Sequence, residues 1–390
     1  MIATPLLGGC AVGGGAVGGG AGPDTAAGPR VTQAPFGATP EGDSVDLYTL
    51  TNGAGVSMRV MTYGGIIQSL QVPGREGALE DVVLGFDSLE GYTREAYREA
   101  NPYFGALIGR YGNRIDEGQF SIEGETYALE TNNGPNHLHG GTEGFDQVVW
   151  EAEPFERGDS AGVVLAHTSP DGHGGYPGRL DVEVTYTLTS GNAVVIDYRA
   201  RATEATHVNL TQHSYFNLGG EGDILDHRLR LAAEAFTPVD STLIPTGEFR
   251  PVDGTPFDFR EPAAIGARIG AENRQLGIAG GYDHNFVLAR QDRDSLHLAA
   301  RAYDPDSGRL MTVRTTEPGV QFYSGNFLDG SLPGKGGTPH ERHAGFALET
   351  QHFPDAPNQP DFPSTLLRPE ETYTSRTVYA FSTRDSWGSN

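Results

Sequence analysis

The sequence predicts an all-β fold, a large antiparallel β-sandwich with few short helices. Three observations support this prediction. Short apolar or alternating runs follow one another from Val31 almost to the end of the chain. Gly, Asn, Asp and Pro separate these runs at fairly regular spacing, which is typical of turns between strands. Helical periodicity is weak along the whole chain.

The hairpin signals give the expected strands in order. The runs 44–50 and 56–61 flank Asn52-Gly53, a dipeptide that favours the tight turn of a hairpin. The further expected strands are a second tight hairpin over 120–129, two alternating strands at 180–188 and 193–200 joined by 190–192, and a closing strand over 372–381. Helical turns are expected only within 88–100 and 261–269.

The composition divides the chain into three segments. Residues 1–33 are rich in Gly, Ala and Pro and cannot bury a core, so we expect a disordered leader. Residues 34–384 contain neither an internal repeat nor a linker and are expected to form one catalytic domain. Residues 385–390 form a short tail.

Cys10 is the only cysteine, so an internal disulfide or a zinc-thiolate cluster is excluded. The segment Leu7-Gly8-Gly9-Cys10 resembles the lipobox of a bacterial lipoprotein, which predicts a lipid anchor at Cys10 and a periplasmic or cell-surface location. Only six residues precede Leu7 and none is basic, unlike a complete signal peptide. The alternative interpretation is a cytoplasmic protein with a disordered leader.

The charge argues against several partners. The formal net charge is -24 and the pI about 4.8, whereas binding to nucleic acid requires a basic surface. Lys335 is the only lysine among 27 basic residues. No stretch approaches the roughly 18 consecutive apolar residues of a transmembrane helix.

The first candidate binding segment is the glycine-bounded apolar run 104–115, which delivers Asn113 and Arg114 at its end. The fixed donors of a guanidinium and the mixed donor and acceptor of an amide suit neighbouring sugar hydroxyls. The alternative is that Arg110 and Arg114 form structural ion pairs with acidic residues that follow, such as Asp116.

Two histidines stand in specific polar runs. His139 lies in a glycine-rich loop, where binding groups are common, and its neighbour His137 leaves a metal pair open as an alternative. His213 lies in the run 208–218, in which alternate residues would share one face of a strand: Asn209, Thr211, His213, Tyr215 and Asn217. A strand face this polar suits the wall of a cleft better than the core of a sandwich.

Three further polar residues lie at or within apolar runs. Asp283 stands at the start of one run, Gln321 lies inside a second, and Glu349 lies inside a third. A glutamate in an apolar strand must be paired or functional, because burying its unpaired charge is costly. Burial also raises the pKa of a carboxyl group and strengthens it as a base. The alternative for Glu349 is a structural ion pair with an arginine.

Together these runs resemble the aldose 1-epimerase (galactose mutarotase) family over roughly residues 36–383. Six motifs occur in the family's order. They are Gly-Arg-x-x-Asn-Arg-Ile at 109–115, Asn-Asn-Gly-x-Asn-x-Leu-His-Gly-Gly at 132–141, Asn-Leu-Thr-x-His-x-Tyr-Phe-Asn-Leu at 209–218, the Asp283 segment, Gly-Val-Gln-Phe-Tyr at 319–323, and Leu-Glu-Thr-Gln at 348–351 with its proline-rich tail. The resemblance implies a galactose mutarotase-like supersandwich.

The resemblance also implies roles for individual residues. Glu349 would be the general base and His213 the general acid, with His139 assisting near the ring oxygen. The sugar-binding positions would be Asn113, Arg114, Asp283 and Gln321. The implied reaction interconverts the anomers of free aldohexoses such as glucose and galactose by opening and closing the ring. It needs no cofactor, because nothing is oxidised and no phosphate is transferred. The insertion-like stretch 333–343 departs from the family pattern.

Three alternatives remain open from the sequence. A glycoside hydrolase on the same sandwich would use Glu349 and Asp283 as its carboxylate pair. A non-catalytic sugar-binding module would keep Arg114 and Asp283 but would not need both His213 and Glu349. A phosphosugar epimerase of the same fold would call for additional basic residues in its cleft.

Overall fold

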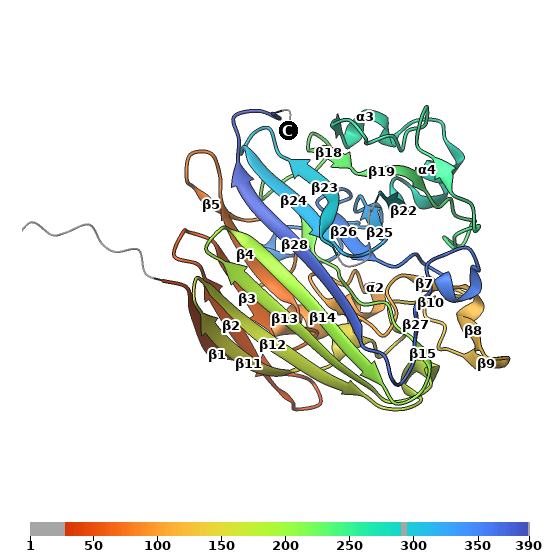
Figure 1. Cartoon of the computed structure of the whole chain (residues 1–390). Helices are drawn as coiled ribbons and strands as arrows, with labels where there is room; N and C mark the ends of the chain where they lie inside the picture. The colour runs from red at the N-terminus through yellow and green to blue at the C-terminus, as the bar shows by residue number, and fades with distance from the viewer. Residues whose placement is uncertain (1–27, 290–294, 389–390) are drawn as a thin grey trace, which may run out of the picture.

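The computed structural model describes residues 28–289 and 295–388. Every ladder between the named strands of this part of the chain is antiparallel. Three large sheets account for most strands, of five, nine and six strands. The predicted all-β antiparallel fold is therefore confirmed (Figure 1).

The five-stranded sheet is built from the first part of the chain, with its strands in sequence order. Its strands are β1 (Arg30–Ala38), β2 (Ser44–Thr51), β3 (Ser57–Met61), β4 (Ile67–Pro73) and β5 (Leu79–Asp81).

The nine-stranded sheet runs across the molecule in the order β11-β12-β13-β14-β28-β24-β23-β18-β21. Its strands are β11 (Glu151–Arg157), β12 (Ser160–Ser169), β13 (Leu180–Thr189), β14 (Ala193–Ala202), β28 (Tyr373–Thr383), β24 (Arg309–Thr315), β23 (His297–Tyr303), β18 (Arg228–Leu231) and β21 (Ala263–Ala264). The C-terminal strand β28 lies between β14 and β24, and so joins the two halves of this sheet (Figure 1).

The six-stranded sheet, in the order β17-β26-β25-β22-β19-β20, carries the glutamate and the other predicted residues of the later motifs. Its strands are β17 (Tyr215–Phe216), β26 (Phe346–Gln351), β25 (Gly319–Tyr323), β22 (Asp283–Leu288), β19 (Ala233–Phe236) and β20 (Arg250–Pro251).

Short elements join the sheets. The two-stranded ladders comprise β6 (Leu107–Ile108), β7 (Arg114–Ile115), β8 (Gln119–Ile122), β9 (Glu125–Ala128), β10 (His137–Leu138), β15 (Thr206–His207), β16 (Thr211–Gln212) and β27 (Leu366–Leu367). The helices are α1 (Leu89–Thr93), α2 (Glu95–Ala100), α3 (Gly266–Ile269) and α4 (Arg274–Ala279). The 3₁₀ turns are η1 (Asp116–Gly118), η2 (Phe145–Gln147), η3 (His173–Gly175), η4 (Lys335–Gly337) and η5 (Ala356–Asn358).

The main hydrophobic core lies on the inner face of the nine-stranded sheet and includes residues from all three sheets. In the first half of this sheet, the hydroxyl of Tyr186 on β13 donates to the carbonyl of Gly65, in the turn between β3 and β4, at 3.0 Å. In the middle of the sheet, the hydroxyl of Tyr379 on β28 donates to the carbonyl of Leu348 on β26 at 3.2 Å. The nine-stranded sheet therefore packs against both smaller sheets, and its hydrogen bond from Tyr379 helps to hold β26 in place.

Most expected elements are confirmed. The two tight hairpins correspond to β2–β3 and β8–β9, the alternating strands to β13 and β14, and the closing strand to β28. Helical turns occur in both expected regions, whereas α4 was not expected. The continuous strand expected over 208–218 is wrong, because this run forms only the two-residue strands β16 and β17.

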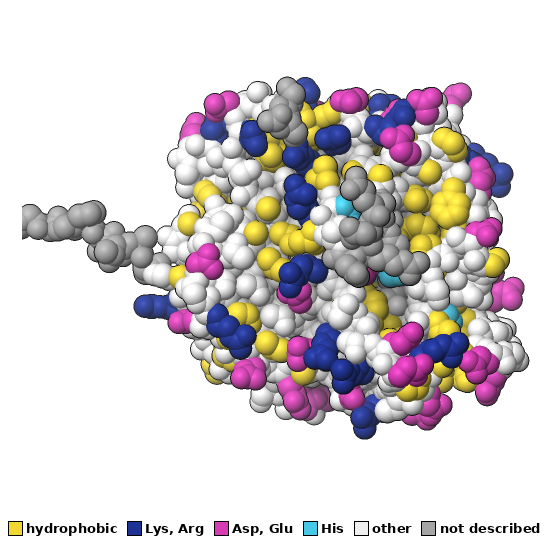
Figure 2. All heavy atoms as spheres, viewed as in Figure 1, with side chains coloured by type: hydrophobic (Ala, Val, Ile, Leu, Met, Phe, Trp, Pro, Cys, Tyr) yellow, Lys and Arg dark blue, Asp and Glu magenta, His cyan; other side chains and the backbone are white. Residues whose placement is uncertain are grey.

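The ends of the chain add two observations. Strand β1 starts at Arg30, so it begins inside the segment that the composition assigns to the leader. The predicted lipid attachment at Cys10 lies outside the described residues. Within 28–289 and 295–388, no helix is both long and apolar enough to span a bilayer. Acidic and basic side chains are scattered among one another on the face shown in Figure 2.

Arg110 is a buried structural residue, only 2% exposed. Its guanidinium donates to four backbone carbonyls in the loop between β12 and β13 and to the hydroxyl of Ser169, at 2.6–3.2 Å. No ion pair joins Arg110 or Arg114 to Asp116 among the salt bridges of the described residues. The expected structural pairing with that carboxylate is therefore wrong.

We expect Arg110→Ala to lower the free energy of unfolding by about 3 kcal/mol, because the loop carbonyls lose their donors while remaining buried. Urea unfolding followed by circular dichroism measures this loss. The exposed Arg199 on β14 provides the control, and Arg199→Ala is expected to stay within about 0.5 kcal/mol of the wild type. Equal stability of the two variants would contradict the role assigned to Arg110.

Candidate active site

A ladder of polar side chains attaches the 208–218 run to β26. Asn209 accepts a hydrogen bond at 2.9 Å from the backbone N–H that follows β26. Two residues later, the hydroxyl of Thr211 donates to the carbonyl of Thr350 at 3.0 Å. Two residues later again, His213 faces Glu349. The expected alternation of Asn209, Thr211 and His213 on one side is thus confirmed, although the strand itself is interrupted.

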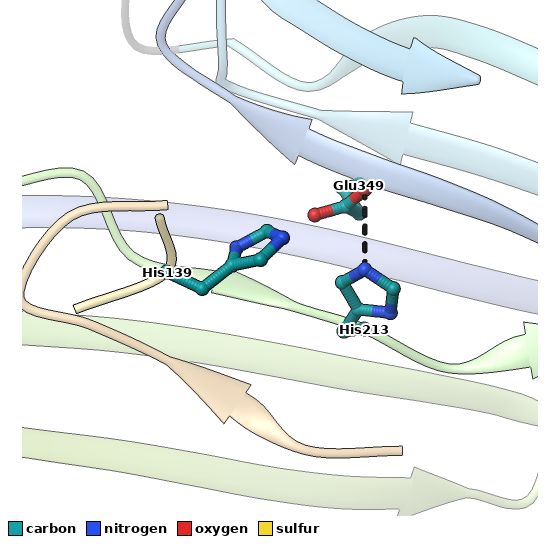
Figure 3. A group of neighbouring side chains, drawn as sticks. All are labelled: His139, His213 and Glu349. Carbon is teal, nitrogen blue, oxygen red and sulfur yellow. Dashed lines mark ion pairs between the residues drawn. The ribbon is translucent and has the colours of Figure 1, made fainter. Parts of the chain in front are cut away.

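His213 and Glu349 form the centre of the site (Figure 3). The distance from His213 Nε2 to Glu349 Oε1 is 3.6 Å, and the two side chains are 5% and 3% exposed. The backbone of His213 is fixed on both sides, because its N–H donates to the carbonyl of Ala106 at 2.9 Å and its carbonyl accepts from Gly105 at 3.0 Å. Among the salt bridges of the described part of the chain, none joins Glu349 to an arginine. The alternative of such an ion pair is therefore wrong.

His139 completes a group of three. The Nδ1 atom of His139 accepts a hydrogen bond from the backbone N–H of Asn113 at 3.1 Å. The backbone N–H of His139 donates to the carbonyl of Asn113 at 3.0 Å. Its backbone has the unusual φ of 52°. The next residue must be glycine, because a side chain at Gly140 would overlap the carbonyl of Gly109. The turn therefore holds the imidazole of His139 beside that of His213, with ring centroids 5.1 Å apart.

Burial favours the neutral form of each of the three groups. It raises the pKa of Glu349 well above its ordinary value, Asp283 raises it further, and Arg114 opposes both. Burial lowers the pKa of His213 to about 4. The pKa of His139 is lowered well below its usual value by burial and then by His213. Because the pKa of Glu349 is raised and that of His213 is lowered, the two groups become able to share one proton.

The predicted binding residues lie around this group. Arg114 donates from Nε to the Asn133 side chain at 2.9 Å, which leaves the rest of its guanidinium free for other contacts. Gln321 donates from Nε2 to Asp283 Oδ1 at 2.7 Å. Burial raises the pKa of Asp283, and Arg114 and Gln321 act in the opposite direction. Gln321 thus orients a carboxylate at the edge of the site.

All but one of the predicted site residues line one cavity of about 610 Å³. This volume lies within the range of about 300–1,000 Å³ that is common for small-molecule sites. The predicted residues that line it are Asn113, Arg114, His139, His213, Asp283 and Glu349. Gln321 is not among the lining residues, and it reaches the cavity only through Asp283.

These contacts test the alternative of a metal pair and bear on a second possible metal site. His137 does not face the cavity, because its ring nitrogens lie 2.7 Å from the Glu130 carbonyl and 2.9 Å from the Tyr176 hydroxyl. A metal pair of His137 and His139 is therefore wrong. His139, His213 and Glu349 each offer one atom that could bind a metal ion, and these atoms lie within 4.8 Å of one another. The guanidinium of Arg114, whose charge acts on both Glu349 and His139, disfavours a cation there.

Comparison with known proteins identifies the family of the chain. The family described as aldose 1-epimerase matches residues 46–380. The chain belongs to the aldose 1-epimerase family.

Relatives of high identity support the same assignment. Galactose mutarotase of Rattus norvegicus is 48% identical over 355 residues, which cover 90% of this chain and 98% of that protein. Aldose 1-epimerase of Escherichia coli is 39% identical over 345 residues, covering 88% and 96%. The crystal structure of galactose 1-epimerase from Lactobacillus acidophilus superposes with a TM-score of 0.79 at 27% identity and covers 91% of this chain and 99% of that one.

The chain is therefore an isomerase that interconverts the anomers of an aldose sugar. Its fold is the galactose mutarotase-like fold.

Tyr215, expected on the polar face of the 208–218 run, lines the cavity, whereas Tyr103 and Phe327 were not singled out by the sequence. The ring of Tyr103 packs on His139 with centroids 4.6 Å apart and lies 5.8 Å from the ring of His213. Phe327, 60% exposed, stands at the cavity with its ring stacked on Tyr323. An aromatic residue in a β-rich sequence is usually assigned to the core, so the sequence carries no signal that separates these residues from packing residues.

Proposed function

We propose that the chain interconverts the α and β anomers of free aldohexoses, such as glucose and galactose, by acid and base catalysis of ring opening. Glu349 acts as the general base and His213 as the general acid. His139 assists at the ring oxygen, and Asn113, Arg114, Asp283 and Gln321 position the sugar. The observation that carries this proposal is the 3.6 Å separation of His213 Nε2 and Glu349 Oε1 in one cavity.

The short separation suits the chemistry of a hemiacetal. The anomeric hydroxyl and the ring oxygen are bonded to the same carbon, so the groups that serve them must lie close together. Glu349 removes the proton of the anomeric hydroxyl while His213 donates a proton to the ring oxygen. The bond between the anomeric carbon and the ring oxygen breaks, and the open aldehyde forms.

The second half of the reaction reverses these transfers. Rotation about the bond between the first two carbons presents the other face of the carbonyl. The hydroxyl that was the ring oxygen attacks this face, His213 takes back its proton, and Glu349 returns the other proton to the new anomeric hydroxyl. The pair ends with the proton that it started with, so no cofactor is consumed.

The protonation state that burial favours is compatible with this scheme. Burial favours neutral His213 and protonated Glu349, and this form holds the same single proton as the working form with charged His213 and ionised Glu349. A bound sugar supplies hydroxyls that hydrogen-bond to both charged groups, and Arg114 stabilises the carboxylate. Binding therefore requires a shift of one proton within the pair, without exchange with solvent.

We expect Glu349→Gln to reduce kcat by about 10²–10⁴-fold, because the amide cannot accept the anomeric proton. KM should change little. Polarimetry of freshly dissolved α-D-glucose and α-D-galactose measures both constants. Glu248→Gln, at an exposed glutamate paired with Arg250, is the control and should behave as the wild type. Full activity of Glu349→Gln would contradict the role of the base.

The pH dependence of kcat should be bell-shaped. Below about pH 4 the pair gains a second proton on His213, so that ionised Glu349 is lost as the base. At alkaline pH the pair loses its only proton and the acid disappears, and the raised pKa of Glu349 places this loss well above pH 4.5. Initial rates of mutarotation in buffers of constant ionic strength test this shape, and a rate that is flat across about pH 4–9 would contradict it.

We expect Arg114→Met to raise KM by about tenfold or more and to affect kcat less, because hydrogen bonds from a charged donor are among the stronger contacts to a hydroxyl. Arg199→Met, on the exposed face of β14, is the matched control. Saturation curves for the same two sugars give the constants. An unchanged KM for Arg114→Met would show that this guanidinium does not hold the substrate.

A further inference from the structure

The face of the sheet that carries Glu349 also carries two polar residues, Asn285 and Gln351, which the proposed mechanism does not use. In the antiparallel register of β26, β25 and β22, Glu349 lies opposite Gln321, and Gln321 lies opposite Asn285. Residues directly opposite in neighbouring strands share one face of the sheet. Gln351 lies two residues beyond Glu349 and therefore shares this face as well.

The amide groups of Asn285 and Gln351 are fully enclosed but unpaired. The two residues are 1% and 0% exposed. Neither the oxygen nor the nitrogen of either amide has a hydrogen-bonding partner among the described residues. Gln321 Oε1 and Glu349 Oε2 on the same face are also unpaired, so six buried polar atoms without partners gather on this part of the sheet.

The two amides converge above a glycine. Gly319 pairs directly with Gln351, and a methyl group on Gly319 would overlap Asn285 Oδ1, so the Asn285 amide extends over the place where a side chain would stand. The ring of Phe353 lies over the same glycine. Gln351 Oε1 lies 3.5 Å from the place where a side chain on Gly112 would begin, at the start of the turn that carries the sugar-binding residues.

Buried amides in proteins are almost always hydrogen-bonded, to the chain or to enclosed water. The missing partner here must be small, because both residues are almost completely buried. It must also both donate and accept, since each amide presents an N–H group and a carbonyl. A cation would satisfy only the oxygens. Water meets both requirements and typically makes two to four such bonds in buried positions.

We propose that Asn285 and Gln351 bind one or more buried water molecules beneath Glu349, and that this water donates a hydrogen bond to Glu349 Oε2. The two amides are then positioning residues, which act on the reaction through the water and the carboxylate. This inference rests on the role of Glu349 as the base. It gives the second carboxylate oxygen a partner, while the first faces His213 and the sugar.

The consequence of this water is a more acidic Glu349, because a donor to the carboxylate stabilises its ionised form. Burial and Asp283 act in the opposite direction. The other titratable groups that face or act on Glu349 are His139, His213, Arg114, Tyr215, Tyr323 and Tyr379. None of these is altered when Asn285 or Gln351 is replaced, so a change in the titration of Glu349 reports on the amides.

The variants Asn285→Leu and Gln351→Met test the proposal, because each keeps the approximate shape of the side chain and removes both polar atoms. Loss of the donor raises the pKa of Glu349, so the His213–Glu349 pair keeps its proton to higher pH. The alkaline limb of kcat should therefore move upward by about one pH unit, which corresponds to a tenfold change in the acid dissociation constant. At neutral pH kcat should fall by about tenfold, with a smaller change in KM.

Gln68→Met is the matched control. Gln68 lies on β4, is 3% exposed, donates to the Phe86 carbonyl at 2.8 Å and leaves its Oε1 unpaired, but it does not line the cavity. Its replacement should lower thermal stability without moving either limb of the pH profile. A purely structural role of Asn285 and Gln351 predicts the same behaviour for their variants, and an unmoved alkaline limb would therefore overturn the proposal.

A crystal structure of the wild-type protein at a resolution that shows ordered water gives a second test, which does not depend on the folding of any variant. We expect water within hydrogen-bonding distance of Asn285, Gln351 and Glu349 Oε2. Direct packing of the two amides against each other, with no water, would overturn the proposal. If Glu349→Gln remains fully active, the proposed base itself has failed. If Glu349→Gln is inactive, but the alkaline limb does not move in the amide variants and the crystal structure shows no water, then Glu349 is the base and only the proposal of the water is wrong.

Discussion

The structure depends on one costly arrangement, a carboxyl group placed next to an imidazole inside a β-sandwich and away from bulk water. Burial alone makes the neutral form of each group more stable, and this raises the pKa of Glu349 while it lowers that of His213. Because the two shifts have opposite signs, the pair holds one proton between them over a wide range of pH. A group that must give a proton and a group that must take one are thus kept ready without a cofactor.

The scaffold holds this pair through backbone geometry as much as through side-chain contacts. Several residues that line the cavity have a positive φ, which most residues avoid, among them Tyr103, Asn113 and His139 with φ values of 58°, 62° and 52°. Such strain persists only where the surrounding structure imposes it. Here the turn at His139 is bonded in both directions to the turn at Asn113, so a catalytic and a binding residue are fixed together.

Much of the fold and site could be predicted from the sequence, for reasons that differ between elements. The hairpins and alternating strands are local signals, and they were found where expected. The convergence of Glu349, His213 and His139 was expected from a resemblance to a family, because spacing along the chain does not state which strands become neighbours. The ladder of Asn209 and Thr211 on β26 illustrates this, since its partners lie more than a hundred residues away.

The features that the sequence did not predict are long-range or conformational. Tyr103 is indistinguishable from a core residue until its ring is seen against His139. Arg110 was expected to pair with a nearby carboxylate, yet it binds loop carbonyls about sixty residues away. Asn285 and Gln351 carry no motif of their own, and only the sheet register places them beside Gln321 and Glu349.

The central claim is that Glu349 and His213 work as one unit around a single shared proton. The kcat values of Glu349→Gln, His213→Asn and the double variant, measured by polarimetry under the same conditions, test it most directly. If the two residues act together, the double variant will be about as slow as the slower single variant. Losses that multiply in the double variant would mean that the two side chains contribute independently, and would contradict the account.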